Sequence, residues 1–208
     1  MLQIIVSLLL GYFIGSFPTA YLMVKWKTRL DIRSVGSGNV GAMNAFDVTG
    51  SKLLGVFIFL LDVCKGFAAI GLPSVLFSHE FWVVASGGLG SVVGHNYSPW
   101  LRFKGGRGLS TAVGIMMILG WIFVVVWCAL WVIAYLSSKN IHLSNIVAFT
   151  LAPIVIAVVP GNIIGATLPT FVTLNNFIYL CISLCVLILI RHTEPMVELW
   201  KSLRKIHN

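Results

Sequence analysis

Long apolar segments follow one another along the whole chain, separated by short stretches rich in glycine, proline and charged residues. The segments cover residues 2–24, 53–73, 81–101, 110–136, 145–160 and 169–190. About 20 apolar helical residues cross a hydrocarbon core of about 30 Å, so most of these segments approach or reach the length of a membrane span. The pattern therefore predicts an all-α polytopic membrane protein.

The composition supports this class. The 208 residues are 58% hydrophobic and 10% charged, and the mean hydropathy is +0.97, far from the values of a soluble domain. The first segment has no basic region and no small-residue cleavage site ahead of it, so we expect a spanning helix and not a removable signal peptide.

The basic residues predict the orientation. Of the 14 Lys and Arg residues, all but Lys65 lie in residues 25–52, 102–107, 139 and 191–205. Basic loops collect on the cytoplasmic side, so these four regions are expected to share it. The breaks at residues 73–80 and 160–168 contain no Lys or Arg and are expected to be external turns.

Six spans would place the basic C-terminal region on the wrong side of the membrane. A break near Gly120 in the long segment 109–136 resolves the conflict. It predicts about seven transmembrane helices, with the N-terminus outside and the C-terminus cytoplasmic. Each half would have about 13 residues and span only about 20 Å, so both are expected to be short or tilted.

No internal repeat or linker is visible, which predicts one domain over residues 1–208. The amphipathic segment 192–208 is expected to be an interfacial helix.

The formal charge of +8 does not indicate a nucleic-acid partner, because the basic residues are scattered in short loops beside apolar spans. Contact with anionic membrane lipids or an anionic substrate explains them better. The four cysteines lie in apolar stretches without CxxC spacing. We therefore expect no disulfide framework, no metal site and no cofactor.

One polar stretch, "VGSGNVGAMNAFDVTG" at residues 35–50, stands between two apolar segments. Its glycines allow backbone N–H groups to turn toward one point, and hydroxyl and amide side chains add donors, an arrangement that suits a phosphate. The alternative is that the small residues only permit a tight turn or close helix packing. The candidate phosphate-binding residues are Gly36, Ser37, Gly38, Asn39 and Asn44.

A second polar stretch, "FKGGRG", places Lys104 and Arg107 on either side of Gly105 and Gly106, just before a predicted helix start. Helix starts favour anions. The stretch is not a Walker A loop, whose two glycines are separated by four residues and followed by Lys-Ser or Lys-Thr. The alternative to phosphate binding is that the two cations only anchor a cytoplasmic loop. Both polar stretches are predicted to converge on the cytoplasmic face, which indicates a substrate or substrates bearing phosphate.

Three further features are candidates. Asp62 and Lys65 lie i, i+3 within an apolar helix and are expected to pair, either for function or to hold the helices together. His95 either donates to an anion or acts as a base, or it hydrogen-bonds the backbone at a helix end. Ser144, beside other polar residues on the inner side, is a candidate lining residue.

The order of five motifs resembles a known family. The motifs are "GSFPTAYL", "DIRSVGSGNVGAMN", "LLDVCKG", "GHNYSPWLRFKGGRGLST" and "RHTE". Together they resemble the bacterial acyl-phosphate:glycerol-3-phosphate acyltransferases over nearly the whole chain. The resemblance implies a seven-helix protein of the bacterial inner membrane with its active site facing the cytoplasm. It implies transfer of a fatty acyl group from acyl phosphate to the 1-hydroxyl of glycerol 3-phosphate, giving lysophosphatidate and phosphate. The enzyme that makes acyl phosphate is an implied partner.

The resemblance also assigns residues. Ser37, Gly38 and Asn39 match the phosphate-binding positions of the first motif, and residues 104–107 match the second, with Arg107 where the family usually has lysine. His192 matches the histidine of the last motif. The implied catalytic residues are His192, Lys104 and Ser37.

The chain departs from the family pattern at three other positions. Asp47 stands where arginine is usual, Pro195 where asparagine is expected, and Met43 where threonine is usual. Two unit charges about 4 Å apart interact by about 4 kcal/mol at an effective dielectric constant near 20, so the reversal at Asp47 matters to an anion. Asp47 either faces away, pairs with Lys52 or Arg33, or marks an altered substrate.

Acyl phosphate is already activated, so direct attack by the glycerol hydroxyl is sufficient, with His192, His95 or a substrate phosphate as the base. The chain has no GxSxG nucleophile motif and no HxxxxD motif of other glycerolipid acyltransferases. A paralogue with a different acceptor or donor, a transporter of an anionic or phosphorylated solute, and a membrane scaffold are the alternatives. A transporter predicts an internal repeat and polar residues meeting at mid-membrane, and the motifs instead collect at one face.

Overall fold

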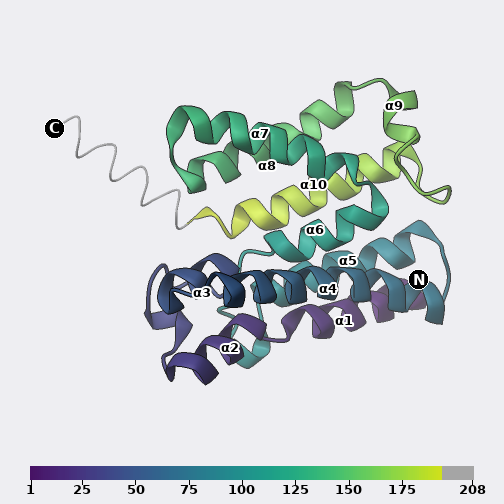
Figure 1. The fold of residues 1–208 in the computed structure, drawn as a ribbon. Coiled ribbons are helices and arrows are strands. Elements are labelled where there is room, and N and C mark those ends of the chain that lie inside the picture. Colours follow the sequence, from purple (N-terminus) through teal and green to yellow (C-terminus); the bar gives the residue numbers. More distant parts are fainter. Residues whose placement is uncertain (194–208) are drawn as a thin grey trace. The chain divides into compact units, whose positions relative to one another are not determined.

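The computed structural model describes residues 1–193, and helices are the regular elements of that part of the chain (Figure 1). The chain divides into two compact units, Met1–Ile118 and Leu119–Asn208. The first unit holds α1 (Leu2–Ser16), α2 (Thr19–Thr28), η1 (Ile32–Ser34), α3 (Ala42–Thr49), α4 (Lys52–Leu76), α5 (Phe81–Asn96), η2 (Pro99–Leu101) and almost all of α6 (Leu109–Leu119). The second holds α7 (Ile122–Ser138), α8 (Ile141–Val158), α9 (Gly161–Gly165) and α10 (Leu174–Ile190).

Glycine allows close helix packing in the first unit. A Cβ at Gly11 of α1 would overlap the carbonyl oxygen of Gly87 in α5, and a Cβ at Gly114 of α6 would overlap that of Val63 in α4. Where lipid surrounds the helices, small residues at a crossing let the backbones approach and gain van der Waals contact. These crossings therefore fix the framework that carries the polar loops.

The first apolar segment, predicted as a spanning helix over residues 2–24, lies within a candidate span Leu2–Thr28, but the helix is broken inside it. The α1 helix ends at Ser16, α2 begins at Thr19, and α2 continues to Thr28. Pro18 has no N–H to donate and disfavours helical geometry at the preceding residue, where Phe17 has φ −58° and ψ 121°. The break leaves the carbonyl oxygen of Phe17 available to a side chain.

The predicted break at Gly120 is confirmed. The α6 helix ends at Leu119 and α7 begins at Ile122. A Cβ at Gly120 would overlap the ring of Phe177 on α10, so the turn must pass close to that ring. In the same unit Trp127 of α7 lies 5.2 Å from the ring of Phe149 on α8, measured between centroids.

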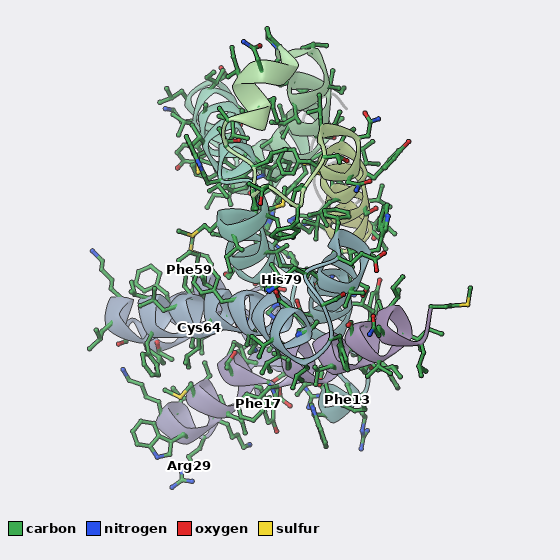
Figure 2. The ribbon with its side chains drawn as sticks, turned by 90° about the vertical axis from the view of Figure 1, so that its right-hand side faces the viewer. Phe13, Phe17, Arg29, Phe59, Cys64 and His79 are labelled. Atoms are coloured by element: carbon green, nitrogen blue, oxygen red, sulfur yellow. The ribbon has the colours of Figure 1, made fainter. Side chains whose placement is uncertain are left out.

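Within residues 1–193, three stretches are long and apolar enough to cross a membrane: Leu2–Thr28, Lys52–Leu76 and Ile141–Val158. The α6, α7 and α10 helices are apolar but shorter. Large apolar side chains such as Phe13, Phe17 and Phe59 are exposed on the outside of the first unit (Figure 2), as expected of a lipid-facing surface. The predicted interfacial helix over residues 192–208 lies almost wholly outside the described residues, as does Pro195.

Candidate functional site

The first polar stretch is a short loop followed by a helix. Gly36 and Gly38 have φ +59° and +69°, a left-handed conformation that glycine adopts without strain. Residues 42–49 form α3, which ends with Gly50 at φ 64°. The second half of this stretch is therefore helical, which its glycine-rich, polar composition did not predict.

Asn44 of α3 shapes the loop from inside. Its side chain is 1% exposed, and its amide donates to the carbonyl oxygens of Ile32 and Val35 at 3.2 Å and of Asn39 at 2.9 Å. Its Oδ1 accepts from the backbone N–H of Ser37 at 2.9 Å. Asn44 therefore closes the loop, while the Ser37 residue itself is exposed.

The second polar stretch lies against the C-terminal end of α5. The N–H of Gly105 donates to the carbonyl oxygen of Asn96 at 3.1 Å, and that of Gly106 to the carbonyl oxygen of His95 at 3.0 Å. A Cβ at either glycine would overlap His95, its carbonyl oxygen or its ring. Both positions therefore require glycine, because the backbone of this loop passes so close to the end of α5. The two N–H groups already donate hydrogen bonds within the protein. Of the flanking cations, Lys104 is exposed and Arg107 half-buried.

The two polar loops meet, which confirms the convergence predicted from the charge pattern. A Cβ at Gly106 would lie 2.6 Å from the carbonyl oxygen of Val40. Nearby, Arg33 donates from Nη1 to the carbonyl oxygen of Leu101 at 3.2 Å. Two independent contacts thus join residues 33–40 to residues 101–106.

Arg33 is held in place by Asp31. The guanidinium donates from Nε to Oδ1 at 3.0 Å and from Nη2 to Oδ2 at 2.6 Å. These hydrogen bonds stabilise the carboxylate and lower the pKa of Asp31 to about 2. The bidentate pair pre-orients Arg33 toward Leu101.

A buried polar cluster lies beside this junction. Asp62 Oδ1 lies 2.8 Å from Lys65 Nζ and accepts from Thr19 Oγ1 at 2.6 Å. Lys65 also donates to the Phe17 carbonyl oxygen at 2.5 Å, and His95 Nδ1 lies 3.9 Å from Asp62 Oδ1. The predicted Asp62–Lys65 pair is confirmed. Thr19 was missed, although a hydroxyl directly after a helix-breaking proline was a usable signal.

A cavity of about 10 Å³ lies between the cluster and the loops. Its lining includes Lys65, His95, Val40 and Gly106. This volume is at the lower limit for one water molecule. The buried cluster that contains Lys65 is therefore separated from the junction of the two loops by a space for one water molecule at most.

Asp47 is exposed on α3 and makes no ion pair with any of residues 1–193. Arg33 pairs with Asp31 instead. Of the alternatives for Asp47, an ion pair with Arg33 or Lys52 is therefore contradicted by the structure. The Asp47 carboxylate faces outward.

Two further candidates belong to the second unit. His192 is fully buried, and its Nδ1 lies 2.8 Å from the carbonyl oxygen of Ile188. A carbonyl oxygen can only accept, so Nδ1 is the donor. Ser144 is also buried and donates to the carbonyl oxygen of Asn140 at 2.7 Å. The first unit thus brings the two loops and His95 together, whereas Ser144 and His192 lie in the second unit.

Comparison with known proteins gives one consistent result. A family model described as glycerol-3-phosphate acyltransferase matches residues 5–202. Glycerol-3-phosphate acyltransferase 2 of Thermotoga maritima is 34% identical over 191 residues, which are 92% of this chain and 90% of that protein. A glycerol-3-phosphate acyltransferase of Rhodopseudomonas palustris is 39% identical over 150 residues, 72% of this chain and 75% of that protein.

Solved structures agree with the sequence comparison. Crystal structures of PlsY, an integral membrane glycerol 3-phosphate acyltransferase, superpose on this chain with TM-scores of 0.78 for the glycerol 3-phosphate form and 0.76 for the lysophosphatidic acid form. Sequence identity is 31% and 30%, and each comparison covers 96% of this chain and 92% of the other.

Proposed function

This chain belongs to the glycerol-3-phosphate acyltransferase family, and from that premise we propose that it acylates the 1-hydroxyl of glycerol 3-phosphate with acyl phosphate as the donor. The products are lysophosphatidate and inorganic phosphate. The observation that supports the reaction best is the meeting of the two polar loops at Val40 and Gly106. Both substrates carry phosphate, and the two loops that meet there carry hydroxyl, amide and cationic side chains.

The chemistry needs no covalent enzyme intermediate. The glycerol hydroxyl oxygen attacks the acyl carbonyl carbon, and the bond from that carbon to the phosphate oxygen breaks with its electron pair leaving on phosphate. The hydroxyl proton passes to a base. The enzyme then lowers the barrier by positioning the substrates and by stabilising the negative charge that grows on the departing phosphate.

Side chains, and not the glycine N–H groups, are proposed to bind the phosphates. The N–H groups of Gly105 and Gly106 are hydrogen-bonded to the end of α5, so these glycines serve the close approach of the backbone. Lys104 and Arg107 supply positive charge. The Ser37 hydroxyl and the Asn39 amide supply hydrogen bonds, with Gly36 and Gly38 setting the turn and Asn44 holding its shape.

His192 is the proposed base. Because Nδ1 donates to the Ile188 carbonyl oxygen, the neutral ring carries its lone pair on Nε2, the form required to accept a proton. His95 lies between Asp62 and Gly106 and is proposed to position the second loop. A substrate phosphate is the alternative base, and Ser144 is proposed as a lining residue.

The proposal extends to topology and location. One domain over residues 1–208 would contain seven membrane helices, with the N-terminus outside and the C-terminus cytoplasmic. The distribution of Lys and Arg supports this arrangement. It places the polar loops at the cytoplasmic face of the bacterial inner membrane, within reach of glycerol 3-phosphate and of an enzyme that produces acyl phosphate.

A donor comparison tests the function. The purified protein is incubated with labelled glycerol 3-phosphate and either palmitoyl phosphate or palmitoyl-coenzyme A, and lysophosphatidate is measured. We expect product with palmitoyl phosphate and at least about 100-fold less when Lys104 is replaced by alanine, the order of effect of one transition-state charge contact. Absence of lysophosphatidate at saturating palmitoyl phosphate would refute the proposal, and product only with palmitoyl-coenzyme A would refute the donor.

The outward-facing carboxylate of Asp47 favours one second candidate, a family member with a different acceptor. The same assay with dihydroxyacetone phosphate or glycerol in place of glycerol 3-phosphate decides between them. Faster acylation of either alternative would establish the second candidate.

A further inference from the structure

A groove of about 690 Å³ lies on the first unit between α2 and the start of α4. It is lined by Trp26, Lys27, Ser51, Leu53, Leu54 and Phe57. Ligand sites commonly have volumes of about 300–1,000 Å³ and mostly apolar linings with a few polar groups. None of the lining residues belongs to the loops of the proposed active site, so a ligand in the groove would be distinct from the substrates bound there.

The apolar part of the groove is highly exposed. Trp26 is 74% exposed, Leu53 is 81% exposed and Phe57 is 47% exposed. Such side chains gain van der Waals contact when an acyl chain packs against them, which stabilises the contact. The tryptophan indole is apolar over most of its surface and has one N–H donor, which suits the boundary between hydrocarbon and headgroups.

The polar part of the groove is cationic. Lys27 and Ser51 are its polar lining residues, and Lys25, Arg29 and Lys52 are close neighbours in the sequence, without a carboxylate among residues 25–30 or 50–61. Each basic residue near a membrane surface strengthens binding to an anionic lipid about fivefold. The ligand is therefore expected to combine an apolar chain with a negative headgroup.

The position of the groove agrees with a lipid. Trp26 and Lys27 lie in the last turn of the candidate span Leu2–Thr28, and Leu53 lies in the first turn of the candidate span Lys52–Leu76. The ends of spans meet lipid headgroups, and a lysine there extends its ammonium toward phosphate while its methylene chain packs on apolar surface. Phe57 lies about one turn further along α4 than Leu53, on the side of the span interior, where we expect acyl chains to pack.

We propose that this groove is a binding site for an anionic phospholipid, separate from the proposed active site. An acyl chain packs against Trp26, Leu53 and Phe57. The headgroup phosphate interacts with Lys27 and with the Ser51 end of α4. The site would select phosphatidylglycerol over phosphatidylcholine, because the latter headgroup carries a compensating positive charge.

Brominated lipids test the proposal, because bromine quenches tryptophan fluorescence only at close range. The full-length protein is placed in vesicles of unlabelled phosphatidylcholine that contain a small fraction of brominated phosphatidylglycerol or brominated phosphatidylcholine. The Trp26 signal is obtained as the difference between the wild type and Trp26→Phe. We expect half-maximal quenching at an about fivefold lower fraction of brominated phosphatidylglycerol.

Charge variants provide the matched control. Lys27→Gln should abolish most of the preference for phosphatidylglycerol, and Lys27→Arg should keep it. Lys139→Gln removes the same charge from an exposed position of the second unit and should leave the preference unchanged. Acyl transfer measured in neutral detergent should be unaffected in all three variants, which confirms folding and separates this test from that of the proposed function.

Two results would overturn the site. Equal quenching by the two brominated lipids would show no headgroup selection. An equal loss of preference in Lys27→Gln and Lys139→Gln would show that the overall charge of the protein attracts the lipid without a local site.

Discussion

Replacing Asp62 by asparagine tests the buried polar cluster beside the two loops. The side chains of Asp62 and Lys65 are only 2% and 8% exposed, and their charged atoms are 2.8 Å apart. Asparagine keeps the size of the side chain but removes its charge. Lys65 is then left as a buried cation without a counter-charge, although the Phe17 carbonyl oxygen and the Thr19 hydroxyl stay within hydrogen-bond distance.

The expected cost follows from this geometry. Removing one partner of a buried ion pair costs about 3–5 kcal/mol, mostly because the remaining charge is uncompensated. The two oxygens that still contact Lys65 place this site at the lower end, about 3 kcal/mol. At about 2–4 °C per kcal/mol for a chain of this size, the melting temperature should fall by about 6–12 °C.

Thermal unfolding of the purified protein in detergent, followed by tryptophan fluorescence, measures the effect. Asp47→Asn is the matched control, because Asp47 is exposed and makes no ion pair with residues 1–193; its melting temperature should change by less than about 2 °C. The double replacement Asp62→Leu with Lys65→Met should recover much of the loss, because it removes both charges. If Asp62→Asn melts within 2 °C of the wild type, the pair does not stabilise the fold as argued.

Three further predictions concern the loops. Lys104→Ala should lower acyl transfer by about 100-fold or more with little change in melting temperature, because the side chain is exposed; near-normal turnover would contradict the phosphate role. Asp47→Arg should raise kcat/KM for glycerol 3-phosphate, because it replaces a repulsive charge by an attractive one, and an unchanged or reduced value would show that Asp47 does not weaken the site. Asp31→Asn should lower the melting temperature at neutral pH. Because Asp31 has its pKa lowered from 3.8 to about 2 by Arg33, the stabilisation is present above about pH 4 and is lost as the pH falls toward 2. The difference in melting temperature between the wild type and the variant should therefore shrink as the pH falls from 4 to 2, and a difference as large at pH 2 as at pH 7 would contradict the ion-pair argument.

Much of the architecture followed from local patterns in the sequence. Hydrophobic runs identify a membrane protein because the bilayer demands about 20 apolar residues per span. The distribution of Lys and Arg predicted both the break at Gly120 and the convergence of the two loops, and the structure contains both. The i, i+3 spacing of Asp62 and Lys65 was enough to predict their pair, because helix geometry places such residues on one face.

The tertiary structure alone decided what the polar groups of the loops contact. The glycines and asparagines of the two polar stretches predicted hydrogen-bond donors for phosphate. In the structure, however, the Gly105 and Gly106 N–H groups donate to carbonyl oxygens at the end of α5. The Asn44 amide donates to carbonyl oxygens of its own loop. A sequence shows which donors exist, whereas the path of the backbone decides which acceptors they reach. For the same reason the Phe17 carbonyl oxygen, at the helix break before Pro18, accepts a hydrogen bond from the Lys65 ammonium. No local pattern encodes this contact, because the two residues are far apart in the chain.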